Sequence, residues 1–276
     1  MRKYLVLTVI GVLIMTLEIG QARVSSVADS AVQYASTGWT EEAESRTWSY
    51  SSADAPTYIF SVNADMTGII STNMKLRFKQ SAGTYKYAGV TAVGSYSGGV
   101  TLITAYFGTD YDLDNEAITN VAYSTMRAPF GFPMSRDKWT VEVVDTSTRT
   151  QPTPTINDWY NIGTTNSQIN IPIGDWDVSY QVFAGADLNS LTTNVYTTLS
   201  TANNTQSNAH MTAAVNIGNS SVSVLIESRL VASDFLSLAS KATYYLNAKT
   251  GTSGVPNIYF GGATIPTIIR AVWAGL

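Results

Sequence analysis

The sequence predicts an all-β protein in which a small N-terminal β-barrel is followed by a C-terminal sandwich or jelly roll. An N-terminal helical or signal-like segment precedes both. Three observations favour this fold class. Short segments of alternating apolar and polar residues recur from about residue 47 to the C-terminus, as in antiparallel sheets with one buried face. Glycine, asparagine and proline separate these segments. Only the N-terminal run shows a helical repeat of apolar residues over several turns.

Length and composition agree with two domains. The 276 residues suffice for two cores, and the charged fraction of 13% is about half of the ~25% usual for soluble domains. The surface must therefore be rich in Thr, Ser, Asn and Gly. A net charge of −4 without a basic cluster argues against nucleic-acid binding. The chain has no cysteine, which excludes disulfides and thiolate sites.

Residues 1–22 resemble a secretory signal peptide. Arg2 and Lys3 precede an apolar run from Tyr4 to Leu17, and the segment closes with the small residues around Ala22. The run is short for a membrane span, so a cleaved signal and a retained buried helix or anchoring segment both stay open. Residues 23–46 are small and polar. We expect them to form a linker or stalk, partly helical, that contributes nothing to a core.

Residues 47–133 are predicted to form the small β-barrel. Positive-φ glycines for hairpin turns are offered by Gly83, Gly98, Gly99 and Gly108. The expected strands are Tyr58–Val62, Met74–Phe78, Tyr85–Val93 and Val100–Phe107.

Residues 134–276 are predicted to form the sandwich or jelly roll. Prolines near residues 129 and 133, and again at 152 and 154, interrupt the strand pattern, so the domain boundary is placed near residue 133. Seven or more short strands with no helical period are typical of this architecture. The expected strands are Trp139–Asp145, Gln168–Ile173, Trp176–Phe183, Val195–Leu199, Met211–Ile217, Val222–Glu227, Thr243–Ala248 and Thr267–Ala274.

The second domain resembles the jelly rolls of the tumour-necrosis-factor and complement globular-head superfamily, which associate as trimers. The resemblance rests on the glycine turn and aromatic strand of residues 171–182, on residues 243–248, and on the apolar final strand from Ile268. It implies a TNF-like fold and a final strand that is central in its sheet.

From about residue 45 to the C-terminus, the chain also resembles a family of phage-encoded virion, tail or minor structural proteins. The segments that carry this resemblance are 52–57, 74–80, 85–87, 108–111, 128–133, 139–150 and 198–204. It implies a virion location. A secretory signal at residues 1–22 would instead imply a secreted or surface-bound protein.

Catalytic chemistry has few candidate residues. His210 is the only histidine, which leaves no His pair for zinc, and we expect it to be exposed or to contact a ligand. Two carboxylates could still hydrolyse glycosides. The acidic series Asp110, Asp112, Asp114 and Glu116 resembles the start of a calcium loop but lacks the turn glycine, so a solvated loop is favoured. We therefore predict no metal, no cofactor and no enzymatic activity.

The binding surface is expected on two amide-rich connections of the second domain, residues 184–194 and 200–210. Neutral amides and hydroxyls pair well with sugar hydroxyls. The candidate binding residues are Asp187, Asn189, Asn203, Asn204, Gln206, Asn208 and His210. The final strand is apolar on both faces, which predicts a homotrimer interface at Ile268, Ile269, Val272 and Trp273.

These features favour a non-enzymatic phage virion protein, a trimeric fibre or receptor-binding component whose partners are its own copies, other virion proteins and host-surface glycans. A secreted or surface-anchored jelly-roll adhesin or lectin is the second interpretation. A polysaccharide depolymerase is the third.

Overall fold

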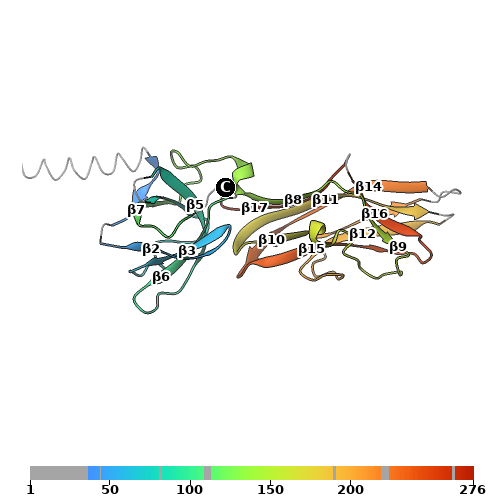
Figure 1. Cartoon of the computed structure of the whole chain (residues 1–276), viewed down its shortest axis with the longest axis horizontal. Helices are drawn as coiled ribbons and strands as arrows, with labels where there is room; N and C mark the ends of the chain where they lie inside the picture. Colours follow the sequence, from blue (N-terminus) through green and yellow to red (C-terminus); the bar gives the residue numbers. More distant parts are fainter. Residues whose placement is uncertain are drawn as a thin grey trace, which may run out of the picture.

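The computed structural model of the protein describes residues 37–43, 45–80, 83–108, 113–188, 191–218, 224–262 and 265–276. The signal-like segment 1–22 and most of the expected linker lie outside the described residues. The all-β prediction is confirmed. The molecule is elongated, with a curled sheet at one end and a two-sheet sandwich at the other (Figure 1). The elements η1 (Arg136–Trp139) and η2 (Thr164–Ser167) are short 3-10 turns.

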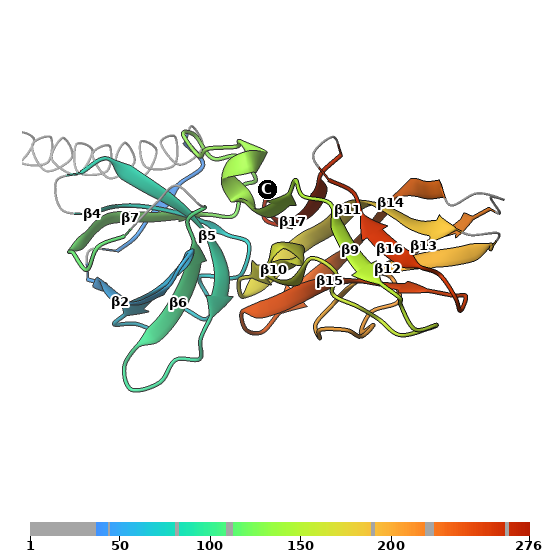
Figure 2. The ribbon, with the colours of Figure 1, turned by 45° about the vertical axis from the view of Figure 1, so that its right-hand side comes forward.

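The N-terminal domain is one seven-stranded antiparallel sheet in the order β1-β7-β4-β5-β6-β3-β2. The sheet curls on itself (Figure 2). In the core that it encloses, Phe60, Phe78 and Phe107 meet edge to face. The end strands β1 and β2 do not pair with each other in the described residues, so the barrel is open along one seam. Its strands are β1 (Thr40–Glu41), β2 (Trp48–Asp54), β3 (Thr57–Val62), β4 (Lys75–Gln80), β5 (Tyr85–Val93), β6 (Thr101–Tyr106) and β7 (Ile118–Ser124).

The expected linker is wrong at its C-terminal end. Trp39 is buried in the main core, and its Nε1 donates a hydrogen bond to the carbonyl oxygen of Phe130 at 2.8 Å. The next residues form β1, which pairs with β7. The buried Trp39 side chain and the pairing of β1 with the edge of β7 attach this small, polar segment to the domain. The barrel domain therefore begins before residue 47.

The C-terminal domain is a jelly roll. One sheet has the order β10-β15-β12-β13. The other contains β8-β17-β11 with β14 beside β11, and it is extended by β16 and β9. The final strand β17 lies between β8 and β11, so its expected central position is confirmed. The strands are β8 (Thr140–Asp145), β9 (Arg149–Pro152), β10 (Gln168–Ile171), β11 (Gly174–Leu188), β12 (Thr193–Ser200), β13 (Thr212–Ile217), β14 (Val224–Leu238), β15 (Ala242–Thr250), β16 (Asn257–Phe260) and β17 (Thr267–Trp273).

Two strands are much longer than the sequence pattern predicts. β11 and β14 have 15 residues each and pair along their whole length, from Gly174–Leu238 to Leu188–Val224. The expected loop 184–194 is therefore wrong in its first half, since residues 184–188 belong to β11. The sequence pattern predicts shorter strands because both strands contain small and polar residues such as Ser and Asp. These residues are as typical of turns as of strands.

The barrel keeps a core of its own and also contributes aromatic residues to the core of the jelly roll. Trp139 stacks on Phe132, with ring centroids 4.9 Å apart and planes 6° apart, and Tyr106 of the barrel meets Trp176 edge-on at 5.0 Å. Polar contacts flank this aromatic junction: Asn73 Nδ2 donates to Asp175 Oδ2 at 2.8 Å. The expected boundary near residue 133 therefore falls inside a packed junction.

Candidate functional site

The outer face of the sheet β10-β15-β12-β13 is almost uncharged. Along each strand, residues alternate between the core and this face; Ile169, Val195 and Leu246 point inward. Their neighbours make a surface of amides, hydroxyls and tyrosine rings with Lys249 as its one formal charge among them. These residues are Gln168, Asn170, Asn194, Tyr196, Thr212, Ala214, Asn216, Thr243, Tyr245 and Lys249, while Thr198, Ser200 and Asn247 point to the same side of the sheet but are buried.

A pinned loop, residues 201–211, joins β12 to β13 at the edge of this face. The buried amide of Asn247 holds it: Nδ2 donates to the carbonyl oxygens of Ala202 at 3.1 Å and Thr205 at 2.8 Å. Asn247 Oδ1 accepts from the backbone of Asn204 at 3.3 Å. A side chain that satisfies three backbone groups fixes the loop conformation. The expected connection at 200–210 is therefore present, while its binding role remains a prediction.

A polar pocket of about 370 Å³ lies where this loop meets the start of β10. Its walls come from β9, the segment before β10, β10 itself and the loop. Among the described residues its lining consists entirely of amides, hydroxyls and one tyrosine: Gln151, Tyr160, Asn161, Thr164, Thr165, Gln168, Asn203 and Asn204. Such a wall can both donate and accept hydrogen bonds at neutral pH.

The framework of the pocket is fixed by its own hydrogen bonds. The backbone N–H of Asn161 donates to Asn204 Oδ1 at 2.7 Å, and Asn161 Nδ2 donates to the carbonyl oxygen of Leu246 at 3.2 Å. The Tyr160 hydroxyl accepts from the backbone of Thr155 at 2.9 Å. Thr164 and Asn204 adopt φ of 50° and 57°, the left-handed region that a β-branched threonine rarely enters.

Aromatic rings flank the single cation of this face. Lys249 Nζ lies 4.8 Å from the centroid of the Trp159 ring and 5.1 Å from that of Tyr196. An ammonium between two aromatic faces is attracted to both. Lys249 therefore has partners of its own and does not line the pocket.

The structure divides the predicted binding residues. Asn203 and Asn204 line the pocket. Gln206 and Asn208 instead bond away from it, to Thr212 Oγ1 at 2.7 Å and Asp234 Oδ2 at 2.8 Å. His210 is exposed, as expected, with Nδ1 3.9 Å from Asp234 Oδ2.

Asp187 lies on strand β11 and not on a loop, so its expected place is wrong. It accepts hydrogen bonds from Asn257 Nδ2 at 2.7 Å and from the Tyr259 hydroxyl. Burial, and then Asp187, raise the pKa of Tyr259 to about 12, so the phenol stays protonated and donates at neutral pH. Asn189 lies outside the described residues.

Sequence reasoning missed most of the pocket wall. Gln151, Tyr160, Asn161, Thr164, Thr165 and Gln168 come from segments that were expected only as joints or core strands. No local pattern marks them. Only the closure of β10 and β15 brings them beside residues 203 and 204.

The expected trimer interface on β17 needs correction. Ile269 and Trp273 are 0% exposed in the single chain, and Val272 is buried as well; Ile268 alone is partly exposed. Three of the four residues are thus covered within a single chain, and Ile268 lies on the outer face of the strand with the exposed Arg270. The expectation that the apolar surface of this strand exceeds what one subunit can cover is therefore wrong.

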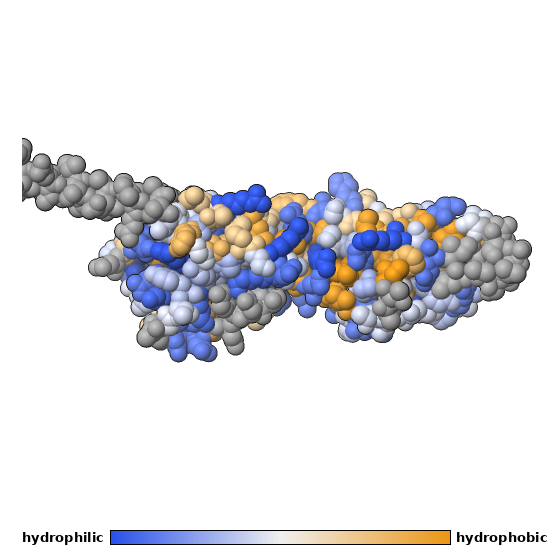
Figure 3. Space-filling view, turned by 90° about the horizontal axis from the view of Figure 1, so that it is seen from above, coloured by the Kyte–Doolittle hydropathy of each residue, from blue (hydrophilic) through white to orange (hydrophobic). Residues whose placement is uncertain are grey.

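Exposed apolar side chains lie instead on the outer face of the sheet β8-β17-β11-β14. Val144, Val231 and Phe235 are 47%, 57% and 55% exposed. A groove of about 310 Å³ runs beside Val231 and Ile268. Seen from above, the jelly roll shows apolar residues grouped with polar ones among them (Figure 3).

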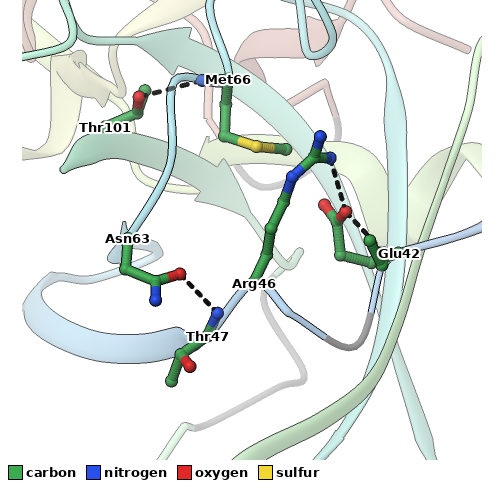
Figure 4. Close-up of polar contacts among 7 residues, drawn as sticks. Glu42, Arg46, Thr47, Asn63, Met66 and Thr101 are labelled. Atoms are coloured by element: carbon green, nitrogen blue, oxygen red, sulfur yellow. Dashed lines mark hydrogen bonds and ion pairs between the residues drawn. The ribbon is translucent and has the colours of Figure 1, made fainter. Parts of the chain in front are cut away.

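A second groove, of about 500 Å³, follows the open seam of the barrel between β2 and β7. Glu42 and Arg46 form an ion pair there at 2.8 Å, and the backbone of Thr47 donates to Asn63 Oδ1 at 2.6 Å (Figure 4). These contacts attach the start of β2 to the barrel. The Glu42 carboxylate is thus already neutralised by its neighbour.

Within the described ranges, no group of three or more His, Cys, Asp or Glu residues could hold a metal ion. Of the acidic series, Asp114 and Glu116 are described, while Asp110 and Asp112 lie outside the described residues. No helix in this part of the chain is long and apolar enough to cross a membrane.

No protein-family model matches the chain, and no curated protein sequence matches it. Among solved structures, dimeric latent PorU from Porphyromonas gingivalis aligns at 10% identity and a TM-score of 0.28, over 86% of this chain and 24% of that one. The infectious bursal disease virus VP2 subviral particle aligns at 13% identity and 0.24, over 82% and 61%. The tandem CBM22 domains of Paenibacillus barcinonensis Xyn10C align at 11% and 0.24, over 85% and 93%.

The chain thus spans about a quarter of the PorU chain and about six-tenths of the VP2 chain. With TM-scores this low, the three alignments describe a loose structural resemblance and assign no function.

Proposed function

We propose that this protein is a non-enzymatic structural component of a bacteriophage virion, a trimeric fibre or receptor-binding protein that contacts host-surface glycans. One observation carries the proposal: the two outer faces of the jelly roll differ in chemistry. One is rich in amides and hydroxyls, has Lys249 as the one charged residue on its strands, and bears a preformed pocket. The other bears exposed apolar side chains. The sequence resemblance to phage structural proteins from about residue 45 onward supports the virion location.

The amide-rich face suits sugars. A sugar presents many hydroxyl groups, each of which donates and accepts, and side-chain amides match both roles. Trp159 and Tyr196 add aromatic surface beside the amides, on which the apolar face of a sugar ring can pack. A pinned loop reduces the entropy that must be lost on binding.

The apolar face suits self-association, with a second and third copy of the chain as its occupants. Isolated apolar side chains are normal on surfaces, but Val144, Val231 and Phe235 share one sheet face with the partly exposed Ile268. Symmetric assembly would cover this face and leave the opposite one free for glycans.

The non-enzymatic assignment is supported by the lining of the pocket. Glycoside hydrolysis uses two carboxyl groups about 5 to 10 Å apart. The described lining offers neither a carboxyl group nor a histidine. Residues that bind without transferring protons are what a receptor-binding protein requires.

Two experiments test the proposal. Mass spectrometry of purified particles should detect this chain, and its absence would remove the virion assignment. Replacement of residues 201–210 by a Gly-Ser linker should abolish binding of the purified trimer to host cells while light scattering still reports a trimer. Binding that survives the replacement would move the site elsewhere.

The alternatives give different results. For a secreted or surface-anchored adhesin, the mature protein would begin at Arg23, whereas virion assembly is consistent with a retained Met1. For a polysaccharide depolymerase, incubation with host envelope glycans would release new reducing ends, and we expect none.

A further inference from the structure

We infer that the pocket between the 201–211 loop and β10 binds an uncharged sugar residue, and that it discriminates against acidic sugars. This inference rests on the proposed glycan-binding function and names the class of glycan.

The amides of the pocket fall into two sets. Asn161, the Oδ1 of Asn204 and the Nε2 of Gln151, which donates to the carbonyl oxygen of Pro152 at 3.0 Å, are used within the protein. In the part of the chain that the structure describes, the side-chain amides of Gln168 and Asn203 make no hydrogen bond. Because both line the pocket, they are the groups available to a ligand. Each offers an N–H donor and a carbonyl acceptor, the complement of a hydroxyl or an acetamido group.

The pocket lacks a cation for an acidic sugar. None of its described lining residues is charged. The cations of the adjoining strands β9 and β15 are engaged: Arg149 donates from Nε to Asp145 at 2.7 Å, and Lys249 lies between two aromatic rings. A carboxylate in contact with this half-open wall would give up part of its hydration and meet no cation in return, whereas a hydroxyl exchanges water for amides that both donate and accept. Neutral residues are therefore favoured over uronic or sialic acids.

Size and rigidity agree with a small ligand. The volume of about 370 Å³ is near the lower end of the range for small-molecule sites, with room for a terminal sugar residue. Because the wall is fixed by internal hydrogen bonds and carries no charge, binding should vary little with ionic strength.

The test is titration of the full-length protein with N-acetylglucosamine, galactose and rhamnose as neutral probes, and with glucuronic and N-acetylneuraminic acids as acidic probes. We expect at least one neutral sugar to bind at least tenfold more tightly than both acids. Its affinity should be unchanged between low and high salt.

Variants link binding to the pocket. Gln168→Leu and Asn203→Ala should each weaken binding of the neutral sugar about tenfold, and Asn115→Ala, which removes an exposed amide of the barrel, should leave the affinity unchanged. Equal thermal unfolding of all variants would show that the fold is intact.

The outcomes separate the two claims. An acidic sugar that binds best, with loss in Asn203→Ala, would overturn the inference and keep the proposed glycan site. A neutral sugar whose affinity is unchanged by Gln168→Leu and by Asn203→Ala would also overturn the inference. The proposed glycan-binding function would then stand, with its site elsewhere on the protein. No binding to any probe, together with no binding to host cells, would overturn both.

Discussion

The indole of Trp273 lies directly against Gly89: a Cβ atom on Gly89 would stand 2.3 Å from Cζ2 of Trp273. Trp273 ends the last strand of the jelly roll, and Gly89 lies in β5 of the barrel. Trp273 also contacts Trp139, at 5.5 Å between ring centroids. A glycine is needed at this close approach for space, and the pair joins the two domains through one core.

We therefore expect Gly89→Ala to destabilise the protein by about 1 to 3 kcal/mol, the cost of overpacking a closed core. Urea unfolding followed by tryptophan fluorescence measures the loss. Gly68→Ala is the matched control, since nothing lies within 4 Å of a Cβ there. If both variants unfold alike, the close packing of Trp273 on Gly89 is contradicted.

Asp145, at the end of β8, is expected to contribute stability that depends on pH. Its carboxylate is buried and accepts hydrogen bonds from Arg149 Nε at 2.7 Å and the Ser147 backbone at 3.0 Å. Burial raises the pKa of Asp145, but these hydrogen bonds and the guanidinium charge outweigh it and leave the pKa below its ordinary value.

Folding thus lowers this pKa, so the contribution is complete above the unfolded value of about 4 and is lost as pH falls through the folded value. Asp145→Asn should cost about 2 kcal/mol at pH 7, and the gap to wild type should close in acid. Glu142→Gln, which breaks the exposed pair with Arg270, should change stability by less than about 1 kcal/mol. A gap for Asp145→Asn that is the same at pH 3 and pH 7 would contradict the assignment.

Asn247→Ala should loosen the 201–211 loop without unfolding the sheet. The loss leaves the carbonyl groups of Ala202 and Thr205 without this donor, at a cost of about 1 to 3 kcal/mol. Hydrogen exchange should increase in this loop and stay unchanged in β11. Asn216→Ala, on the exposed edge strand β13, serves as the control. Uniform exchange across the whole jelly roll would contradict a local anchoring role.

If the protein forms the proposed trimer through this face, Phe235→Asp combined with Val231→Asp should give monomers of 29.7 kDa, because two charges would be buried in the apolar contact between copies. Light scattering at micromolar concentration measures the mass. Phe130→Asp is the control: Phe130 is 76% exposed but lies outside the jelly roll sheets. A wild-type monomer, or a trimer that persists in the double variant, would count against this interface.

Much of the fold follows from local pattern. Period-two alternation identified strands such as Tyr85–Val93, whose bounds are confirmed as β5, and Gly98 and Gly99 adopt the positive φ expected of turn glycines. These features are local because the alternation of side chains and the conformational freedom of glycine act within a few residues. Edge strands such as β2 were missed, because exposure on both faces leaves no alternation to detect.

The sequence by itself determined that the chain is all-β, that its charge is low and that amides crowd the segment 201–210. Only the tertiary structure decided that Trp273 is buried at the domain junction, that the exposed apolar face lies over β14, and that Gln168 meets Asn203 in one pocket. An apolar residue in a strand pattern predicts that its side chain is buried, but it does not predict which other residues bury it. That choice depends on which distant strands pair, and it is made by the closure of the whole chain.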